Sequence, residues 1–120
     1  MNERDFKAKL RRLILPHCYI QSVSSLGVGG TPDLWISGKQ SDLWLEVKFD
    51  DKTKGPILPK LRPLQNKWLN ERQAEGRKVA VLVGTGTSEG IYYVDGLWNF
   101  KKDGRQPLDA IIKRILEDVM

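Results

Sequence analysis

Three charged residues lie within or beside two of the most apolar stretches of the chain. Asp33 precedes the run LWIS, and Glu46 and Lys48 lie two positions apart in the run DLWLEVKF. If the two runs pair as a hairpin, Asp33 and Glu46 can converge. Two adjacent carboxylates raise each other's pKa unless a cation lies between them. The spacing therefore indicates a place where a cation could be held.

A hard divalent ion such as Mg²⁺ prefers an all-oxygen site of this kind, and the carbonyl of Val47 could supply a further ligand. Lys48 lies on the same strand face as Glu46, where its ammonium group could hold a water molecule or stabilise charge on a phosphate. Whether Lys48 or a substrate phosphate orients the water stays open. The alternative is a solvent-facing ion pair between Glu46 and Lys48.

Two further polar residues fall on the expected inward faces of helices. Gln65 lies three residues before Trp68 and four before Leu69, so it belongs to the apolar stripe of its helix. A buried amide needs partners, and Gln65 could find them at the same site. Glu3 lies three residues before Phe6 and could also point inward. The alternatives are an amide at the edge of the stripe and an acid that favours the helix dipole.

The hydrophobic pattern predicts the elements that must position these residues. The run 42–49 alternates, with Leu43, Leu45, Val47 and Phe49 on one face. The run 78–84 is apolar throughout, which is typical of a parallel strand buried on both faces and reached through a crossover helix. The expected elements are helix 3–14, strands 18–24, 34–37 and 42–49, helix 63–75, strands 78–84 and 91–94, and helix 108–119. Their order predicts an α/β (α+β) fold with a mixed sheet.

The charge balance favours a polyanionic partner such as nucleic acid. The chain has 20 lysine and arginine residues against 15 aspartate and glutamate residues, a net charge of +5. The basic residues gather in two segments: the N-terminal set Arg4, Lys7, Lys9, Arg11 and Arg12, and the loop set Lys52, Lys54, Lys60 and Arg62. A rim that binds DNA phosphates would have this composition. Solvated faces beside a flexible loop are the alternative.

Other features exclude several classes of protein. The 120 residues fit one domain, 1–120, and the single cysteine, Cys18, cannot form an intrachain disulfide. One histidine does not support a His-rich zinc site, and GVGG at 27–30 precedes a strand, so it indicates a tight turn and no dinucleotide site. No run is long enough to span a membrane, and the charged start does not resemble a signal peptide. We expect an intracellular, cytoplasmic protein.

The motifs GTPDLW, LEVK and LRPLQNKWL, in this order, resemble the PD-(D/E)XK nuclease superfamily and, more narrowly, its small standalone VRR-NUC domains. The resemblance covers residues 3–84 and implies a restriction-endonuclease-like α-β-β-β-α-β core, to which this chain adds a hairpin strand and a C-terminal helix. It implies Mg²⁺ or Mn²⁺ as the cofactor. It implies metal ligation by Asp33, Glu46 and the Val47 carbonyl, and catalytic roles for Lys48, Gln65 and Glu3.

We therefore expect a divalent-metal-dependent DNA endonuclease. The resemblance implies selectivity for branched DNA, such as four-way junctions, and action as a homodimer. Helix 108–119 could serve the dimer, although the first expectation for its apolar stripe is packing on its own sheet. A restriction-type nuclease is a rival, but 120 residues leave no room for a recognition domain. The rival from another class is a DNA-binding or accessory protein with this fold and no activity.

Overall fold

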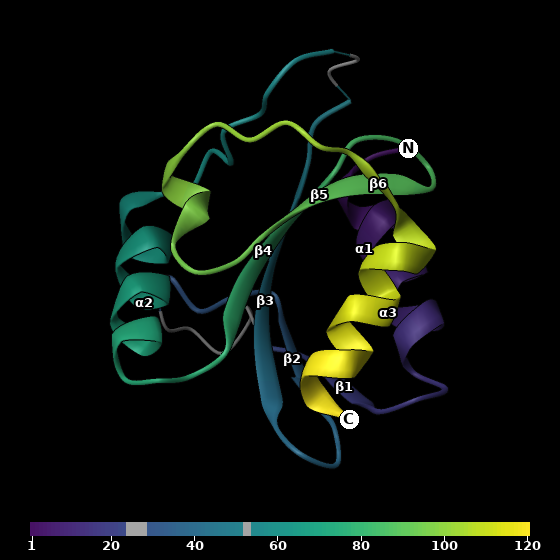
Figure 1. Cartoon of the computed structure of the whole chain (residues 1–120), viewed down its shortest axis with the longest axis vertical. Helices are drawn as coiled ribbons and strands as arrows, with labels where there is room; N and C mark the ends of the chain where they lie inside the picture. The colour runs from purple at the N-terminus through teal and green to yellow at the C-terminus, as the bar shows by residue number, and fades with distance from the viewer. Residues whose placement is uncertain (24–28, 52–53) are drawn as a thin grey trace.

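In the computed structural model, which describes residues 1–23, 29–51 and 54–120, six strands form one mixed sheet in the order β1-β2-β3-β4-β5-β6 (Figure 1). The strands are β1 (Tyr19–Ser22), β2 (Leu34–Ser37), β3 (Asp42–Phe49), β4 (Val79–Gly84), β5 (Glu89–Tyr93) and β6 (Gln106–Pro107). The helices are α1 (Glu3–Ile14), α2 (Pro63–Ala74) and α3 (Leu108–Val119), with a 3-10 turn η1 (Leu97–Asn99).

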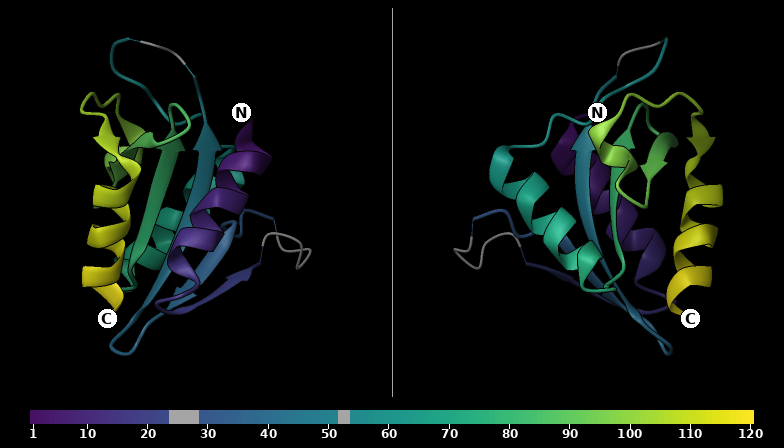
Figure 2. Two further views of the ribbon diagram at one scale, coloured as in Figure 1. Left: turned by 90° about the vertical axis from the view of Figure 1, so that its right-hand side faces the viewer. Right: turned by 60° about the vertical axis from the view of Figure 1, so that its left-hand side comes forward.

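The sheet is covered on both faces. Figure 2 shows α1 and α3 against one face and α2 against the other. β3 and β4 are parallel, while β1–β2, β2–β3, β4–β5 and β5–β6 are antiparallel. The chain leaves β3, crosses through α2 and returns as β4, whose residues are buried along the whole strand. The predicted crossover and its parallel strand are confirmed.

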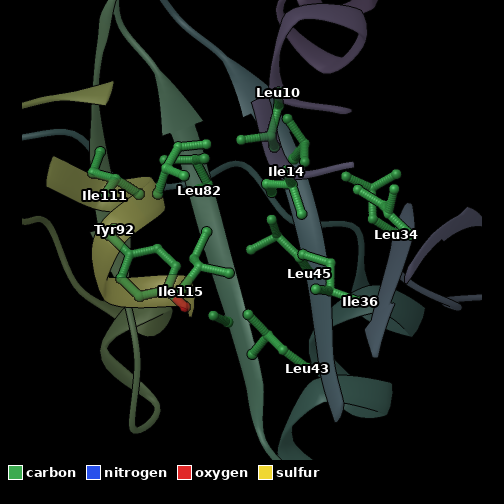
Figure 3. Close-up of a cluster of buried hydrophobic side chains, with 14 of the residues drawn as sticks. Leu10, Ile14, Leu34, Ile36, Leu43, Leu45, Leu82, Tyr92, Ile111 and Ile115 are labelled. Atoms are coloured by element: carbon green, nitrogen blue, oxygen red, sulfur yellow. The ribbon is translucent and has the colours of Figure 1, made fainter. Parts of the chain in front are cut away.

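The alternation of β3 separates two hydrophobic cores. Leu43, Leu45 and Val47 point toward α1 and α3, where they join the larger cluster. Figure 3 shows this cluster, with Leu10 and Ile14 of α1 and Ile111 and Ile115 of α3 directed toward the strands. The smaller cluster lies under α2 and includes Leu69, Val81, Val83 and Trp98. The face of β3 that carries Glu46 and Lys48 therefore looks toward α2.

The predicted α/β mixed-sheet class is confirmed, and so are the main elements. The bounds of helices 3–14 and 108–119 and of strands 34–37 and 42–49 are as predicted. β1 is shorter than the expected 18–24, α2 ends one residue before 75, and β5 begins at Glu89 instead of residue 91. The sequence pattern missed η1 and β6, because elements of two or three residues carry no periodicity.

Capping and packing explain the helices. Asn2 is the N-cap of α1, and its Oδ1 atom accepts a hydrogen bond from the N–H of Asp5 at 2.9 Å. α3 buries Leu108, Ile111, Ile112, Ile115 and Val119, so its stripe packs on the chain's own sheet. Among the described helices, none has the length and apolarity that crossing a membrane requires.

The register between β2 and β3 is held on both faces of the sheet. Leu34 pairs with Leu45 on the side of the larger core. On the other side Trp35 lies opposite Trp44, and their rings stack with centroids 5.9 Å apart and planes 18° from parallel. A slip of one residue would move both pairs to the wrong face. The register thus decides which residues lie opposite each other directly after the Leu34–Leu45 pair.

Gly30 lets the turn before β2 approach the start of α2. Its φ of +86° is in the left-handed region, and a Cβ atom there would lie 2.2 Å from the carbonyl oxygen of Leu64. The other predicted turn glycine that the structure describes, Gly29, also lies against Leu64, while Gly27 is outside the described residues. This close approach brings the segment before Asp33 next to Gln65.

Gly30→Ala should destabilise the protein more than Gly76→Ala. Gly76 has the same φ of +86° but nothing within 4 Å of its position for a Cβ, so both variants incur the left-handed cost of about 1–2 kcal/mol. Only Gly30→Ala adds a clash with backbone, worth about 1–3 kcal/mol more. Urea unfolding of the two variants measures the difference. Equal losses of unfolding free energy would show that the turn does not press against α2.

Candidate active site

Asp33 and Glu46 lie opposite each other at the end of the β2–β3 ladder. Leu34 pairs with Leu45, so the next position along this antiparallel pair brings Asp33 across from Glu46. Oδ2 of Asp33 accepts a hydrogen bond of 2.9 Å from the backbone N–H of Val47. The Asp33 side chain is 13% exposed and Glu46 is 2% exposed. The structure therefore brings the two acids together where little of either side chain is exposed to solvent.

Gln65 holds Glu46 from the side of α2. Nε2 of Gln65 donates a hydrogen bond of 2.6 Å to Oε2 of Glu46. Oε1 of the same amide accepts from the backbone N–H of Arg62 at 2.9 Å, at the N-terminus of the helix. Because the oxygen is committed to Arg62, the amide can present only its N–H group to Glu46. Gln65 is buried on the inward face of α2, where the helical spacing predicted it.

The surroundings of Glu46 disfavour its charge. Burial is the largest cause, and hydrogen bonding and repulsion from Asp33 add to it, so the pKa of Glu46 rises from 4.5 to about 9. The positive charge of Lys48 and the backbone N–H of Asp33 act in the opposite direction but do not compensate. With no cation bound, Glu46 therefore keeps a proton at neutral pH.

Lys48 lies beside a cleft at the end of β3. The cleft has a volume of about 490 Å³ and is lined by Lys48 and Asp50 of the β3 end, by Glu3 of α1 and by Lys60 of the following loop. Lys48 follows Glu46 on the same strand face and is partly buried. Its positive charge also lowers the pKa of Glu46, so Lys48 is near that acid as well as at the cleft. This is where a substrate phosphate could approach.

The prediction that Glu3 lies on an inward face is wrong. Its side chain is 46% exposed and makes an ion pair of 3.8 Å with Lys7, one turn further along α1. Glu3 lines the cleft, whereas Phe6 and Leu10, further along α1, are buried in the larger core. The inward stripe of α1 therefore begins after Glu3.

The backbone of Val47 points toward Asp33. Trp44 directs its N–H to Lys78 before β4, whereas Val47 directs its N–H to Asp33 on the β2 side. In a strand the N–H and C=O of one residue point the same way, so the Val47 carbonyl also faces the acids. No group of three or more acidic, histidine or cysteine side chains gathers among the described residues. Two carboxylates and a carbonyl nevertheless suit Mg²⁺, which keeps several of its waters.

Sequence reasoning missed Lys7 as a member of this site. Its Nζ atom donates to Oδ1 of Asp33 at 3.2 Å, across 26 positions of sequence. In the sequence, Lys7 belongs only to the basic N-terminal set. The one available signal was its position four residues after Glu3, which predicts the ion pair within the helix but not the contact with Asp33.

The basic residues predicted to bind DNA lie at several places around this site. Arg11 donates to Oγ of Ser22 at 2.6 Å, at the end of β1 next to β2. Lys60 lines the cleft, and Arg62 is the exposed N-cap of α2. Arg12 and Lys54 are exposed, and Lys52 lies outside the described residues. Lys60 and Arg62 are thus the predicted cations nearest to the cleft and to Gln65.

The arrangement of sheet, helices and crossover is shared with two solved structures. The structure is similar to that of a VRR_NUC domain protein, with a TM-score of 0.52 and 20% identity, over 71% of this chain and 79% of that chain. It is also similar to Hjc, a Holliday junction resolvase from the archaeal hyperthermophile Archaeoglobus fulgidus, with a TM-score of 0.63 and 16% identity. That similarity covers 91% of this chain and 98% of that chain. No protein-family model and no curated protein sequence matches the chain.

The raised pKa of Glu46 predicts that the metal-free protein loses stability as the pH rises. The folded state keeps the Glu46 proton up to about pH 9, whereas the unfolded chain releases it near 4.5. The folded state thus binds more protons within this window, and unfolding free energy falls by up to about 1.4 kcal/mol per pH unit. Urea unfolding in EDTA between about pH 5 and 9 measures the slope. Glu46→Gln, which cannot ionise, should remove it, and an unchanged slope in that variant would contradict the assignment.

Proposed function

We propose that residues 1–120 form a single-domain, divalent-metal-dependent endodeoxyribonuclease that cuts branched DNA and acts as a homodimer. The observation that carries this proposal is the meeting of Asp33 and Glu46 across neighbouring strands, with Lys48 two residues further along β3. A buried acid and a nearly buried acid next to each other call for a cation, and Lys48 both acts on Glu46 by its charge and lines the cleft. This combination is the minimum that metal-assisted hydrolysis of a phosphodiester needs.

Each residue has a distinct task in this proposal. Asp33, Glu46 and the Val47 carbonyl would hold Mg²⁺ or Mn²⁺, which supplies an activated water and positive charge beside the phosphate. Gln65 fixes the orientation of Glu46 through its 2.6 Å hydrogen bond, so that the carboxylate does not have to reorganise. Lys48 extends toward the cleft, where its ammonium group would face the negative charge that develops on the phosphate.

The choice of DNA as substrate rests on charge and on the fold neighbours. The net charge of +5, the exposed Lys60 of the cleft lining and the exposed Arg62 at the start of α2 suit a phosphate backbone. Hjc of Archaeoglobus fulgidus, which shares the fold, is a Holliday junction resolvase. Four-way junctions are therefore the first branched substrate to test, and flaps and linear duplex are the comparison substrates.

Lys48→Ala should abolish metal-dependent cutting of a labelled four-way junction. Removal of one group that stabilises transition-state charge costs about 100-fold to 1,000-fold in rate. The matched control is Lys39→Ala, which removes the same charge from the exposed turn joining β2 and β3, at the other end of these strands. The control should cut as the wild type does. Reactions in Mg²⁺ and in EDTA establish the metal requirement.

Two results would contradict this function. Junction binding without cutting by the wild type in Mg²⁺ or Mn²⁺ favours a DNA-binding protein with no activity. Cutting by Lys48→Ala at the wild-type rate would mean that the lysine has a different role. Equal cutting of junction, flap and linear duplex would leave the nuclease standing but remove the selectivity for branches.

The homodimer is supported by a hollow of about 460 Å³ on α3. It is lined by the buried Ile112 and by Leu116 and Met120, which pack against the larger core but are only partly buried. The same hollow is flanked by Asp109, Lys113 and Glu117, whose charges alternate in sign along the helix. A surface of this kind can pair with itself about a twofold axis, because an antiparallel copy places lysine opposite the acids.

Leu116→Glu should convert the dimer to a monomer, because it places a charge in the centre of the apolar hollow. The matched control is Leu13→Glu, the same change at a residue of α1 that is 40% exposed. Light scattering coupled to size exclusion gives the mass of each variant, and circular dichroism reports whether it is folded. A wild type that is monomeric at all concentrations would contradict the homodimer without any variant.

A further inference from the structure

Lys7 occupies a position between two acids, one inside the candidate site and one at its rim. Its Nζ atom lies 3.2 Å from Oδ1 of Asp33 and 3.8 Å from Oε2 of Glu3. The Lys7 side chain is 29% exposed, between the values of 13% for Asp33 and 46% for Glu3. The lysine therefore has one partner that is nearly buried and another that faces solvent.

Both carboxylate oxygens of Asp33 already have partners. Oδ2 accepts from the backbone N–H of Val47 at 2.9 Å, and this bond belongs to the strand framework. Oδ1 is held by the lysine, whose side chain is flexible. A divalent ion that binds Asp33 and Glu46 would need Oδ1 or a place close to it, where it would meet the ammonium group. The divalent ion and the Lys7 ammonium group would then be neighbours, and two neighbouring cations repel strongly in a partly buried site.

We infer that Lys7 is a built-in counter-cation that competes with the divalent ion for Asp33 and moves to Glu3 when the ion binds. The inference rests on the proposed function, because it concerns the same metal site. Glu3 is one helical turn from Lys7 and is its second partner, so the lysine keeps an acidic neighbour after it leaves Asp33. Glu3 thereby acts through Lys7, as a positioning residue, and does not need to reach the metal.

This arrangement has a consequence for metal affinity. The ion must displace Lys7, so the affinity of the DNA-free protein for metal is lower than the two carboxylates alone would give. Removal of the lysine charge should raise that affinity, which is the opposite of what the loss of a supporting residue would do. Removal of the Glu3 charge should lower the affinity for metal, because Lys7 then has no second carboxylate with which to pair when it leaves Asp33.

The test is titration of the DNA-free protein with Mn²⁺, followed by electron paramagnetic resonance of the free ion. Lys7→Met should bind Mn²⁺ about tenfold more tightly than the wild type, because it removes an opposite charge in contact with a ligand. The matched control is Lys9→Met on the same helix, whose ammonium group bonds to Thr87 and Ser88 and does not contact Asp33. It should stay within about twofold of the wild type. Lys7→Arg should keep the weak affinity.

A double-mutant cycle tests the role of Glu3. Glu3→Gln should weaken Mn²⁺ binding in the wild type and have no effect in the Lys7→Met background. Asp5→Asn removes the same charge from the same exposed turn and controls for long-range effects. An equal effect of Glu3→Gln in both backgrounds would mean that Glu3 does not act through the lysine.

The inference is overturned if Lys7→Met binds Mn²⁺ no more tightly than the wild type, or if Lys9→Met shifts the affinity equally. It is also overturned if Asp33→Asn leaves binding unchanged, because the ion would then be bound elsewhere. Junction cutting is measured separately. A protein that shows the predicted shifts in affinity but cuts no DNA would retain the role of Lys7 and refute the nuclease.

Discussion

The site depends on one constraint, which is the register that sets Asp33 across from Glu46. The pairing of β2 with β3 is fixed by Leu34 with Leu45 on one face and by Trp35 with Trp44 on the other. Because these pairs lie on opposite faces, the strands cannot slip without exposing one and burying the other. The acids follow as the next pair, directly before the start of β2 and within β3.

Once the acids are together, the charge around them has to be balanced. Burial and the proximity of Asp33 leave Glu46 protonated in the absence of a cation. Lys7 pairs with the outer oxygen of Asp33, and Lys48 acts on Glu46 from the side of the cleft. The negative charge of the two carboxylates is thus compensated by a proton and two lysines. A divalent ion could compensate the same charge, which is the physical basis for expecting a metal there.

β3 serves the core and the site at the same time. Its alternate residues Leu45 and Val47 bury themselves against α1 and α3, while Glu46 and Lys48 face the side of α2. The parallel pairing with β4 requires a crossover, and α2 is that crossover. The same helix delivers Gln65 to Glu46, so the connection that the topology demands also supplies the polar partner that the buried acid needs.

The sequence by itself determined which faces Glu46, Lys48 and Gln65 take. Period-two alternation put Glu46 and Lys48 on the face of β3 opposite the larger core, and helical spacing put Gln65 inward, because these patterns depend only on local geometry. Tertiary structure decided the contacts between residues that are far apart in the sequence. Lys7 meets Asp33 only because α1 packs on the sheet with its first turn at the cleft, and the same placement leaves Glu3 exposed. The protonation of Glu46 also required the fold, since burial and the approach of Asp33 are its causes.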